Sequence, residues 1–351
     1  MEKLLILRLG SMGDILHALP AAAALRRAFP SASIGWAVEQ RWSELLCAGG
    51  AESAARGSPE KPLIDRLHFI NTVAWRKAPF TSATRQDARE AMSALRGARY
   101  EVAVDLQGAW KSAGLALWSG ARERIGFASP RESPAAIFYT RRVVTTAPHV
   151  ADQNLELAAA VTGQHPGRAC FPLPCSTATE TWCEAELRQR GLEDFALLSP
   201  GGGWGAKLWL PENYGQVAAA LGHEGLPSLV NFGPGEEGLA REVEQASAGA
   251  AQPICSSLGE LIALVRRASI FIGGDSGPMH LAAALGIPVV AIFGPTDPAR
   301  NGPYGTRNTV LRSPASATSY SHHDRPDVAL HSIPVQEVVR AALRLLGAGD
   351  G

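Results

Sequence analysis

Residues 4–21, LLILRLGSMGDILHALPA, decide the fold. Residues 4–9 form an apolar run that stops at Gly10, which is typical of a buried strand ending in a turn. Residues 14–28 follow with the apolar spacing of a helix, and the pattern ends near Pro30. A buried strand, a glycine turn and a helix in this order indicate one repeat of an α/β fold.

The alternation of apolar runs and helical patterns continues along most of the chain. Further strands are expected at residues 34–38, 102–106, 196–199, 228–232, 270–273 and 289–293. Further helices are expected at 82–95, 110–118, 151–161, 177–190, 212–221, 236–246, 258–267, 279–285 and 335–346, whereas 306–325 carries no regular pattern. Continuous apolar strands between helices predict parallel sheets that helices cover on both faces.

One stretch interrupts this alternation. Residues 163–176, GQHPGRACFPLPCS, hold three prolines and two glycines, which is typical of a linker. The chain of 351 residues also exceeds the roughly 100–200 residues of one typical domain. We therefore expect two α/β domains that face each other across a cleft, with ligands beyond the carboxyl ends of the strands.

The composition excludes several classes of protein. With 33 basic and 33 acidic residues the formal net charge is zero, which argues against a generally basic nucleic-acid binder. No run approaches about 18 uncharged apolar residues, and the first apolar run is interrupted at Arg8, so neither a transmembrane helix nor a secretory signal is expected. The five cysteines are irregularly spaced, which is typical of reduced thiols in the cytoplasm.

The first candidate site is the turn GSMGD at residues 10–14. Its glycines permit a tight turn and close approach of a ligand to the backbone. The helix that follows offers free N–H groups and a positive potential. Asp14 also lies where it would cap this helix, so a structural role and a catalytic role both stay open. The turn is neither GxGxxG nor a P-loop, which disfavours a dinucleotide or triphosphate site.

The second candidate site is IFIGGDSGPMH at residues 270–280, where a buried strand enters a glycine turn and then a helix. The N–H groups of Ser276 and Gly277 would point at an anion, with help from the helix dipole. His280 lies about one turn into the helix and could also reach a phosphate. The pattern predicts a phosphate site, and the alternative is a well-capped helix with a packed histidine.

Two further loops follow predicted strands of the second half. PGGGWGAKLW at residues 200–209 carries four glycines and Lys207, which is the only lysine of the C-terminal half. A single lysine beside a glycine loop favours an anionic partner, and the alternative is a solvated surface amine. GPGEE at residues 233–237 places Glu236 where a carboxylate could accept ribose hydroxyls or simply begin a helix.

Together these stretches resemble a known family. LLILRLGSMGDILHALPA, the glycine loop that ends in Lys207, and GGDSGPMHLAAALGIPVVAIFGPTDP are similar to glycosyltransferase family 9, the heptosyltransferases of lipopolysaccharide core synthesis. The similarity covers nearly the whole chain. WAVEQ, VAWRKAPF, VDLQGAWKSA and SPRESPAAIFYTRR resemble the branch of the family that adds the first heptose.

The resemblance implies a GT-B architecture of two Rossmann-like, doubly wound parallel-sheet domains facing a cleft. Residues 1–165 would bind the acceptor, 166–325 would bind the ADP-sugar, and 326–351 would form a helix returning to the N-terminal domain. The implied reaction moves L-glycero-D-manno-heptose, with inversion, from ADP-heptose to a 3-deoxy-octulosonic acid (Kdo) residue of Kdo2-lipid A. We expect a monomer that is cytoplasmic and peripheral at the inner membrane.

The motif positions also imply roles for single residues. Asp14 matches the family's general base, and Lys207 matches the lysine that meets the donor's diphosphate. The expected donor-binding residues are Gly13, Gly202, Gly203, Glu236, Asp275, Ser276, Gly277 and His280. The expected acceptor-binding residues are Ser11, Met12, Arg76, Lys77, Lys111 and Arg131.

No cofactor is expected to be required, with Mg²⁺ as an optional assistant, because the relevant turns lack a DxD cluster. Cys170 and Cys175 have no matching second pair, which disfavours zinc. His322, His323 and His331 form no paired cluster and are expected to be solvated. The loop before Lys207 departs from the family because it lacks hydroxyl residues, so that backbone amides must replace them.

Other functions stay open on the sequence alone. A relative could add the second heptose or another nucleotide-activated sugar, and a GT-B epimerase uses the same architecture. A protein that binds a sugar nucleotide without catalysis is a further alternative. The presence of Asp14 and Lys207 argues against it, because a pure binder needs no base directed at the cleft.

The zero net charge conceals a separation of charge along the chain. Residues 1–175 carry 21 basic and 15 acidic side chains, a net +6, and residues 176–351 carry 12 and 18, a net −6. The excess is concentrated in residues 66–142, with 13 basic and 6 acidic side chains. A basic first domain suits an acceptor that carries phosphates and carboxylates at an anionic membrane.

Overall fold

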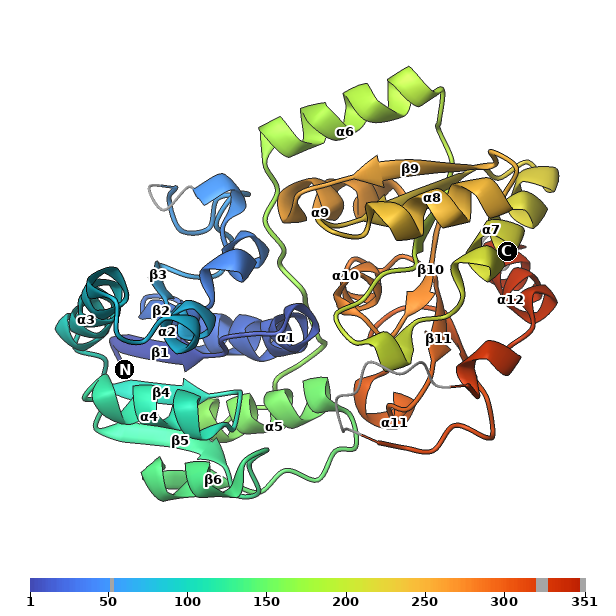
Figure 1. The fold of residues 1–351 in the computed structure, drawn as a ribbon. Helices are drawn as coiled ribbons and strands as arrows, with labels where there is room; N and C mark the ends of the chain where they lie inside the picture. The colour runs from blue at the N-terminus through green and yellow to red at the C-terminus, as the bar shows by residue number, and fades with distance from the viewer. Residues whose placement is uncertain (51–53, 320–327, 348–351) are drawn as a thin grey trace. The chain divides into compact units, whose positions relative to one another are not determined.

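A computed structural model describes residues 1–50, 54–319 and 328–347. The chain divides into two compact units, Met1–Pro174 and Cys175–Gly351. Each unit contains one six-stranded sheet (Figure 1). Residues 163–176 contain neither helix nor strand, as their prolines and glycines predict.

The strands of the first unit are all parallel, in the order β3-β2-β1-β4-β5-β6. They are β1 (Lys3–Leu7), β2 (Ser33–Val38), β3 (Arg66–Phe69), β4 (Val102–Asp105), β5 (Glu123–Phe127) and β6 (Arg141–Val143). The helices are α1 (Met12–Ala28), α2 (Thr72–Lys77), α3 (Ser82–Gly97), α4 (Trp110–Trp118) and α5 (Val150–Thr162). Leu5 and Leu7 of the central β1 are buried among residues of α3 and α4. Right-handed crossovers place α1, which packs along α5, on the other face.

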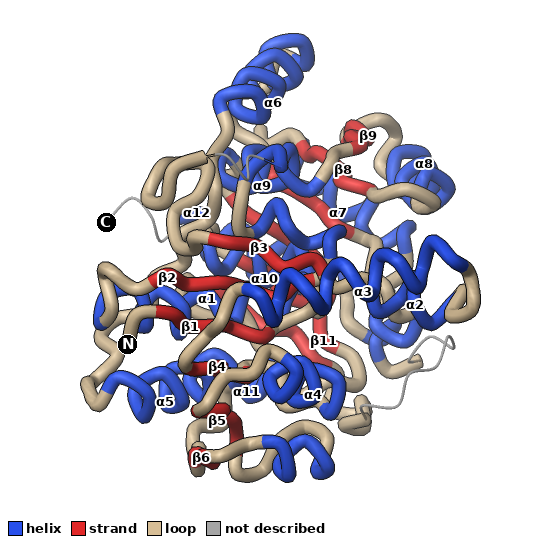
Figure 2. The backbone as a smooth tube through the Cα atoms, turned by 90° about the vertical axis from the view of Figure 1, so that its left-hand side faces the viewer, coloured by secondary structure: helices blue, strands red, loops and turns tan. Residues whose placement is uncertain are grey.

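The second unit repeats this pattern, with the parallel order β12-β11-β10-β7-β8-β9. Its strands are β7 (Ala196–Ser199), β8 (Ser228–Phe232), β9 (Ala251–Cys255), β10 (Ile270–Gly274), β11 (Val289–Phe293) and β12 (Asn308–Arg312). Its helices are α6 (Thr177–Arg190), α7 (Pro211–His223), α8 (Glu237–Ala246), α9 (Leu258–Arg267), α10 (Gly277–Ala284), α11 (Pro298–Asn301) and α12 (Val335–Gly347). Figure 2 shows the strands enclosed by helices, which confirms the predicted doubly wound α/β class.

Both sheets reverse their strand order at the centre, between β1 and β4 in the first unit and between β7 and β10 in the second. In doubly wound sheets, ligands bind beyond the carboxyl ends of the strands at this switch point. The loops that follow β1, β4, β7 and β10 hold most of the predicted site residues. The topology therefore gives each unit one candidate site.

The sequence did not predict the four edge strands β3, β6, β9 and β12, nor β5, which pairs with both β4 and β6. β12 falls within the stretch 306–325 that was expected to be irregular, yet it pairs with β11 from Val289↔Asn308 to Phe293↔Arg312. β6 is only Arg141–Val143 and is mostly exposed, and β9 contains Pro253, which an edge strand tolerates. Outer strands are exposed on one side, so they lack the continuous apolar run that identifies an inner strand.

The last helix lies elsewhere than expected. Val338, Ala341 and Ala342 of α12 are buried in one cluster with residues of α7, β10 and β11. α12 thus packs within the second unit, whereas the resemblance implied a helix returning to the N-terminal domain. The two units also divide after Pro174, not after the expected residue 165.

Candidate functional site

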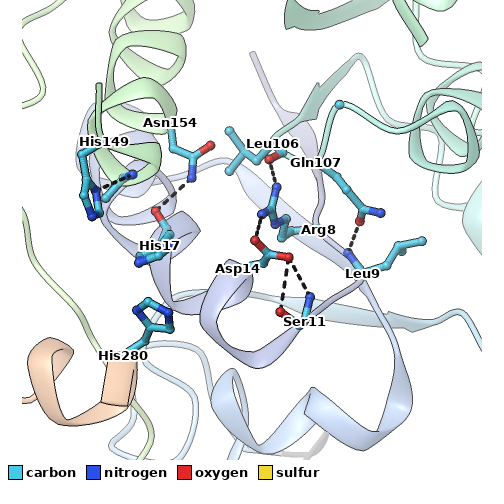
Figure 3. Close-up of polar contacts among 12 residues, drawn as sticks. Arg8, Leu9, Ser11, Asp14, His17, Leu106, Gln107, His149, Asn154 and His280 are labelled. Carbon is cyan, nitrogen blue, oxygen red and sulfur yellow. Dashed lines mark hydrogen bonds and ion pairs between the residues drawn. The ribbon is translucent and has the colours of Figure 1, made fainter. Parts of the chain in front are cut away.

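The first site lies where β1 leads into α1 (Figure 3). Asp14 is in the first turn of α1, and its Oδ1 lies 2.5 Å from Nη2 of Arg8. The backbone N–H of Ser11 donates to Asp14 Oδ2 at 3.0 Å, and the Ser11 hydroxyl lies 3.3 Å from the same oxygen. The Asp14 side chain keeps 27% exposure. Asp14 therefore completes the capping box of its helix while part of its side chain stays exposed, so a structural role and a catalytic role are compatible.

Arg8 and Gln107 tie this turn to the neighbouring strand β4. Nη1 of the buried Arg8 donates to the carbonyl of Leu106, and the N–H of Leu9 donates to Gln107 Oε1 at 2.8 Å. Neither residue was among the predicted site residues. The available signal was a single charge inside an apolar run, directly before a glycine turn.

The electrostatic surroundings keep Asp14 ionised. Burial raises the pKa of Asp14, but the charge of Arg8, the N–H of Ser11 and the charge of Arg131 together bring that pKa below the ordinary aspartate value. At neutral pH the group is a carboxylate. It can accept a hydrogen bond, and then a proton, from a hydroxyl whose oxygen is forming a bond.

We expect Arg8→Met to raise the pKa of Asp14, because burial then acts without the opposing guanidinium charge. The change is measurable as an upward shift of the Asp14 carboxyl titration in ¹³C NMR spectra. Arg27→Met, in the last turn of the same helix, is the matched control and should leave that titration in place. An unchanged Asp14 titration in Arg8→Met would contradict this account of the site.

The four predicted basic acceptor residues follow three different strands of the first sheet. Arg76 and Lys77 end α2, which follows β3. Lys111 lies in the first turn of α4 after β4, and Arg131 follows β5. Arg131 lies close enough for its charge to act on Asp14. Met12 and Gly13 are buried at the start of α1.

The second site is organised by the buried carboxylate of Asp275, directly after β10. Its Oδ2 lies 2.5 Å from Lys207 Nζ and accepts a hydrogen bond from Thr296 Oγ1 at 2.6 Å. Its Oδ1 lies 3.2 Å from His280 Nε2. Lys207 also lies over the ring of Trp204, 4.8 Å from the centroid. Burial raises the pKa of Asp275, but His280 and Lys207 bring it well below the ordinary value.

This geometry refines the expected role of Asp275. The carboxylate accepts from protein groups on three segments, so it positions Lys207 and His280 at the carboxyl ends of β7 and β10. Thr296, which follows β11, was not predicted, because nothing local in the sequence links it to Asp275. The result is a cationic lysine that a buried anion holds in place beside a helix N-terminus.

We expect Asp275→Asn to lower the free energy of unfolding by about 3 kcal/mol at neutral pH, because it removes one partner of a buried ion pair. A depressed native pKa means that the carboxylate stabilises the fold above its unfolded pKa and that this stabilisation is lost as the pH falls. The variant should therefore lose less stability in acid than the wild type. Urea unfolding at neutral and acidic pH measures both effects.

The matched control for this variant is Asp194→Asn. Asp194 is exposed and accepts a hydrogen bond from Ser269 Oγ at 3.1 Å, so the expected loss is below about 1 kcal/mol. Equal free energies of unfolding for Asp275→Asn and the wild type would show that the Asp275 carboxylate does not stabilise the fold.

The turn after Asp275 has the geometry of an anion site. Ser276 occupies the N-cap position of α10, which begins at Gly277, and its side chain makes no capping hydrogen bond. The first N–H groups of a helix have no partner within the helix and can bind an anion. Within the described part of the chain, Ser276 Oγ is buried and has no hydrogen-bond partner. A hydroxyl left in this way is available to a bound group.

The glycine loop and Glu236 meet beside β7. The carboxylate of Glu236 accepts from the N–H of Gly233 at 2.9 Å, and a Cβ at Gly201 would overlap that carboxylate. A Cβ at Gly202 would make ordinary contacts, and one at Gly203 would meet open space. The spatial need for glycine therefore lies at Gly201, which was not among the predicted residues.

Several sequence predictions concern metals and membranes. Across residues 1–50, 54–319 and 328–347, no three His, Cys, Asp or Glu side chains are grouped to hold a metal ion. His331 lies in a short 3-10 helix, Leu330–Ser332, and His322 and His323 lie outside the described residues. In the same part of the chain, each helix is too short or too polar to cross a bilayer.

Comparison with known proteins agrees with this architecture. A sequence model described as glycosyltransferase family 9 (heptosyltransferase) matches residues 89–328. Lipopolysaccharide heptosyltransferase 1 of Escherichia coli O18:K1:H7 is 26% identical over 323 residues, which cover 90% of this chain and 93% of that protein. Lipopolysaccharide heptosyltransferase 3 of E. coli K12 is 26% identical over 349 residues and 95% of each chain. The solved structure of E. coli heptosyltransferase WaaC with ADP has a TM-score of 0.80 at 24% identity, over 98% of this chain and 99% of that one.

Proposed function

The chain belongs to glycosyltransferase family 9, and from that premise we propose that it transfers L-glycero-D-manno-heptose from ADP-heptose to a Kdo residue of Kdo2-lipid A. The family makes the protein a heptosyltransferase of lipopolysaccharide core synthesis. The choice of the first heptose follows the similarity to heptosyltransferase 1 over 90% of the chain. The equally broad similarity to heptosyltransferase 3 makes the acceptor the point to test.

The observation that carries the proposal is the ionised Asp14 carboxylate beside Arg8, at the switch point of the first sheet. An inverting transfer needs a base on the acceptor hydroxyl. As the acceptor oxygen bonds to the anomeric carbon, the bond from that carbon to the diphosphate oxygen breaks, and the hydroxyl proton passes to Asp14. A carboxylate of low pKa accepts this proton late, when the anomeric carbon is already strongly cationic.

The second unit supplies what the leaving group needs. The departing ADP gains negative charge, and Lys207 with the N–H groups of Ser276 and Gly277 would stabilise it. The remaining proposed donor contacts are Glu236 toward the ribose, His280 toward a phosphate, and the backbone of Gly202 and Gly203. Because Lys207 is already positioned by Asp275, it need not reorganise as this charge develops.

Acceptor binding is assigned to the first unit. Its basic residues Arg76, Lys77, Lys111 and Arg131 would meet phosphates and Kdo carboxylates, while Ser11 and Met12 would line the position of the reacting sugar. We assign Gly13 to the donor, as a small residue at the mouth of the turn. The protein would act as a monomer that is cytoplasmic and peripheral at the inner membrane.

We propose that the reaction requires no metal. The positive charge at the leaving group comes from Lys207 and from helix N–H groups, so Mg²⁺ would assist at most. Addition of a chelator should leave transfer largely unchanged, and a complete loss of activity that Mg²⁺ restores would contradict this part of the proposal.

The test is ADP release from ADP-heptose with and without deacylated Kdo2-lipid A, together with the mass of the product. Release that requires this acceptor and adds one heptose supports the proposal. Transfer only to an acceptor that already carries a heptose would assign the protein to a later step of core synthesis. Conversion of the donor without acceptor would indicate an epimerase or hydrolase, and the absence of any reaction would indicate a binding protein.

A further inference from the structure

Helix α4 of the first unit carries an apolar outer face. Trp110, Gly114, Leu117 and Trp118 recur at the spacing of one helix face. Trp110, Leu117 and Trp118 are 58%, 47% and 50% exposed, whereas Ala113 and Ala116 on the inner face are buried. A helix that packs on a sheet normally turns polar residues outward, so this face needs an explanation.

The short 3-10 helix Ser133–Phe138 extends this apolar area. It packs against α4, and Ala113 of α4 is buried with Ala135 and Tyr139. Its Ile137 is 72% exposed. Four of the ten large apolar side chains exposed in the described residues thus lie on two adjoining helices. We name this area the α4 surface, made of Trp110, Leu117, Trp118 and Ile137.

Basic side chains flank the α4 surface. Arg96 Nη1 donates to the carbonyl of Trp118 at 3.0 Å, and Arg142 Nε donates to the carbonyl of Ala136 at 3.0 Å. Lys111 lies on α4 itself. These residues belong to the stretch 66–142, which has 13 basic and 6 acidic side chains. Exposed tryptophan and aliphatic side chains with basic neighbours match the interface of an anionic bilayer.

The α4 surface also begins at the edge of the acceptor site. Trp110 is the first residue of α4, which follows the carboxyl end of β4 after a short loop. Its N–H donates to Glu132 Oε2 at 2.9 Å, and Glu132 adjoins Arg131, whose charge acts on Asp14. A lipid whose chains stay in a bilayer under α4 would therefore hold its headgroup near this edge.

We propose that the α4 surface is the part of the protein that rests on an anionic membrane. The inference rests on the proposed function, because it explains how an acceptor reaches Asp14 without leaving the bilayer. Trp110, Leu117, Trp118 and Ile137 enter the interfacial layer, while Arg96, Lys111 and Arg142 meet anionic headgroups. Binding then requires both apolar contact and negative lipid charge.

The test compares two double variants by sedimentation with acceptor-free vesicles of phosphatidylethanolamine and phosphatidylglycerol, at about three to one. Leu117→Ser/Ile137→Ser removes two aliphatic side chains from the α4 surface and is expected to reduce the bound fraction at least about fivefold. Leu343→Ser/Val328→Ser removes two exposed aliphatic side chains of the second unit and should bind like the wild type. Vesicles of phosphatidylcholine should bind all three proteins weakly.

Transfer assays separate this inference from the proposed function. Leu117→Ser/Ile137→Ser should keep wild-type transfer to deacylated, soluble acceptor and lose it selectively with acceptor embedded in vesicles. Vesicle binding equal to the wild type would overturn the inference, whatever the activity. A wild-type dimer in light scattering that the double variant converts to a monomer would also overturn it, because the surface would then bind a second copy of the chain.

Discussion

Asp14→Asn is expected to lower kcat for heptosyl transfer by about 10²–10⁴-fold, the usual effect of losing a general base. The amide has nearly the shape of the carboxylate and still accepts a hydrogen bond from Ser11, but it cannot take the proton of the acceptor hydroxyl. KM for ADP-heptose should change little, because all the proposed donor contacts except Gly13 come from the second unit. Steady-state assays with deacylated acceptor measure both constants.

Asp14 also caps α1, so the loss must be separated from instability. Ser11→Ala removes the hydroxyl that lies 3.3 Å from the carboxylate but keeps the carboxylate itself. It should retain activity within about tenfold, since loss of a cap costs about 1 kcal/mol. If a folded Asp14→Asn protein kept more than a tenth of the wild-type kcat, Asp14 would not be the base.

Lys207→Met is expected to lower kcat/KM for ADP-heptose by about 10²–10³-fold, the usual effect of losing one preorganised charge-stabilising group. Methionine approximates the aliphatic part of the lysine side chain but removes the ammonium, and with it the cation–π contact with Trp204. The reduction should appear in kcat and in donor binding alike, because the diphosphate is charged before and after its bond to the sugar breaks. Calorimetric titration with ADP measures the loss of nucleotide affinity separately from the loss in kcat.

A second substitution distinguishes two explanations of that loss. Lys207 lies 2.5 Å from the buried Asp275 carboxylate, so Lys207→Met alone leaves a buried charge with one partner fewer. If Lys207 serves only to balance Asp275, the double variant Lys207→Met/Asp275→Asn should recover activity. If Lys207 acts on the donor, the double variant should recover stability and remain inactive, which is the result we expect.

The sequence predicted the inner strands of both sheets except β5. β1, β7, β10 and β11 are buried on both faces, so their apolar runs and the glycine turns after them are visible in the chain. Outer strands such as β12 are defined by pairing to a neighbour and carry no such run. The final helix was assigned to the wrong partner surface by analogy, because periodicity shows that a helix has an apolar face but not what covers it.

The residues of the candidate sites also fall into two groups, those visible in a local sequence pattern and those defined by contacts with distant segments. Asp14, Lys207 and Asp275 were found because each lies in a glycine turn after a buried strand. Arg8, Gln107 and Thr296 were missed because their contacts join segments far apart in sequence, such as Thr296 with Asp275. Glycine content pointed to Gly202 and Gly203, while the close approach of Glu236 to the backbone is at Gly201.

The cluster around Asp275 has a consequence for how this protein can change over generations. One carboxylate is shared by Lys207, His280 and Thr296, which come from three separate segments. A mutation at one of the four positions leaves the other three mismatched in charge or hydrogen bonding. Drift at these positions is therefore coupled, and a descendant that uses a different donor must replace the cluster as a set or keep it whole.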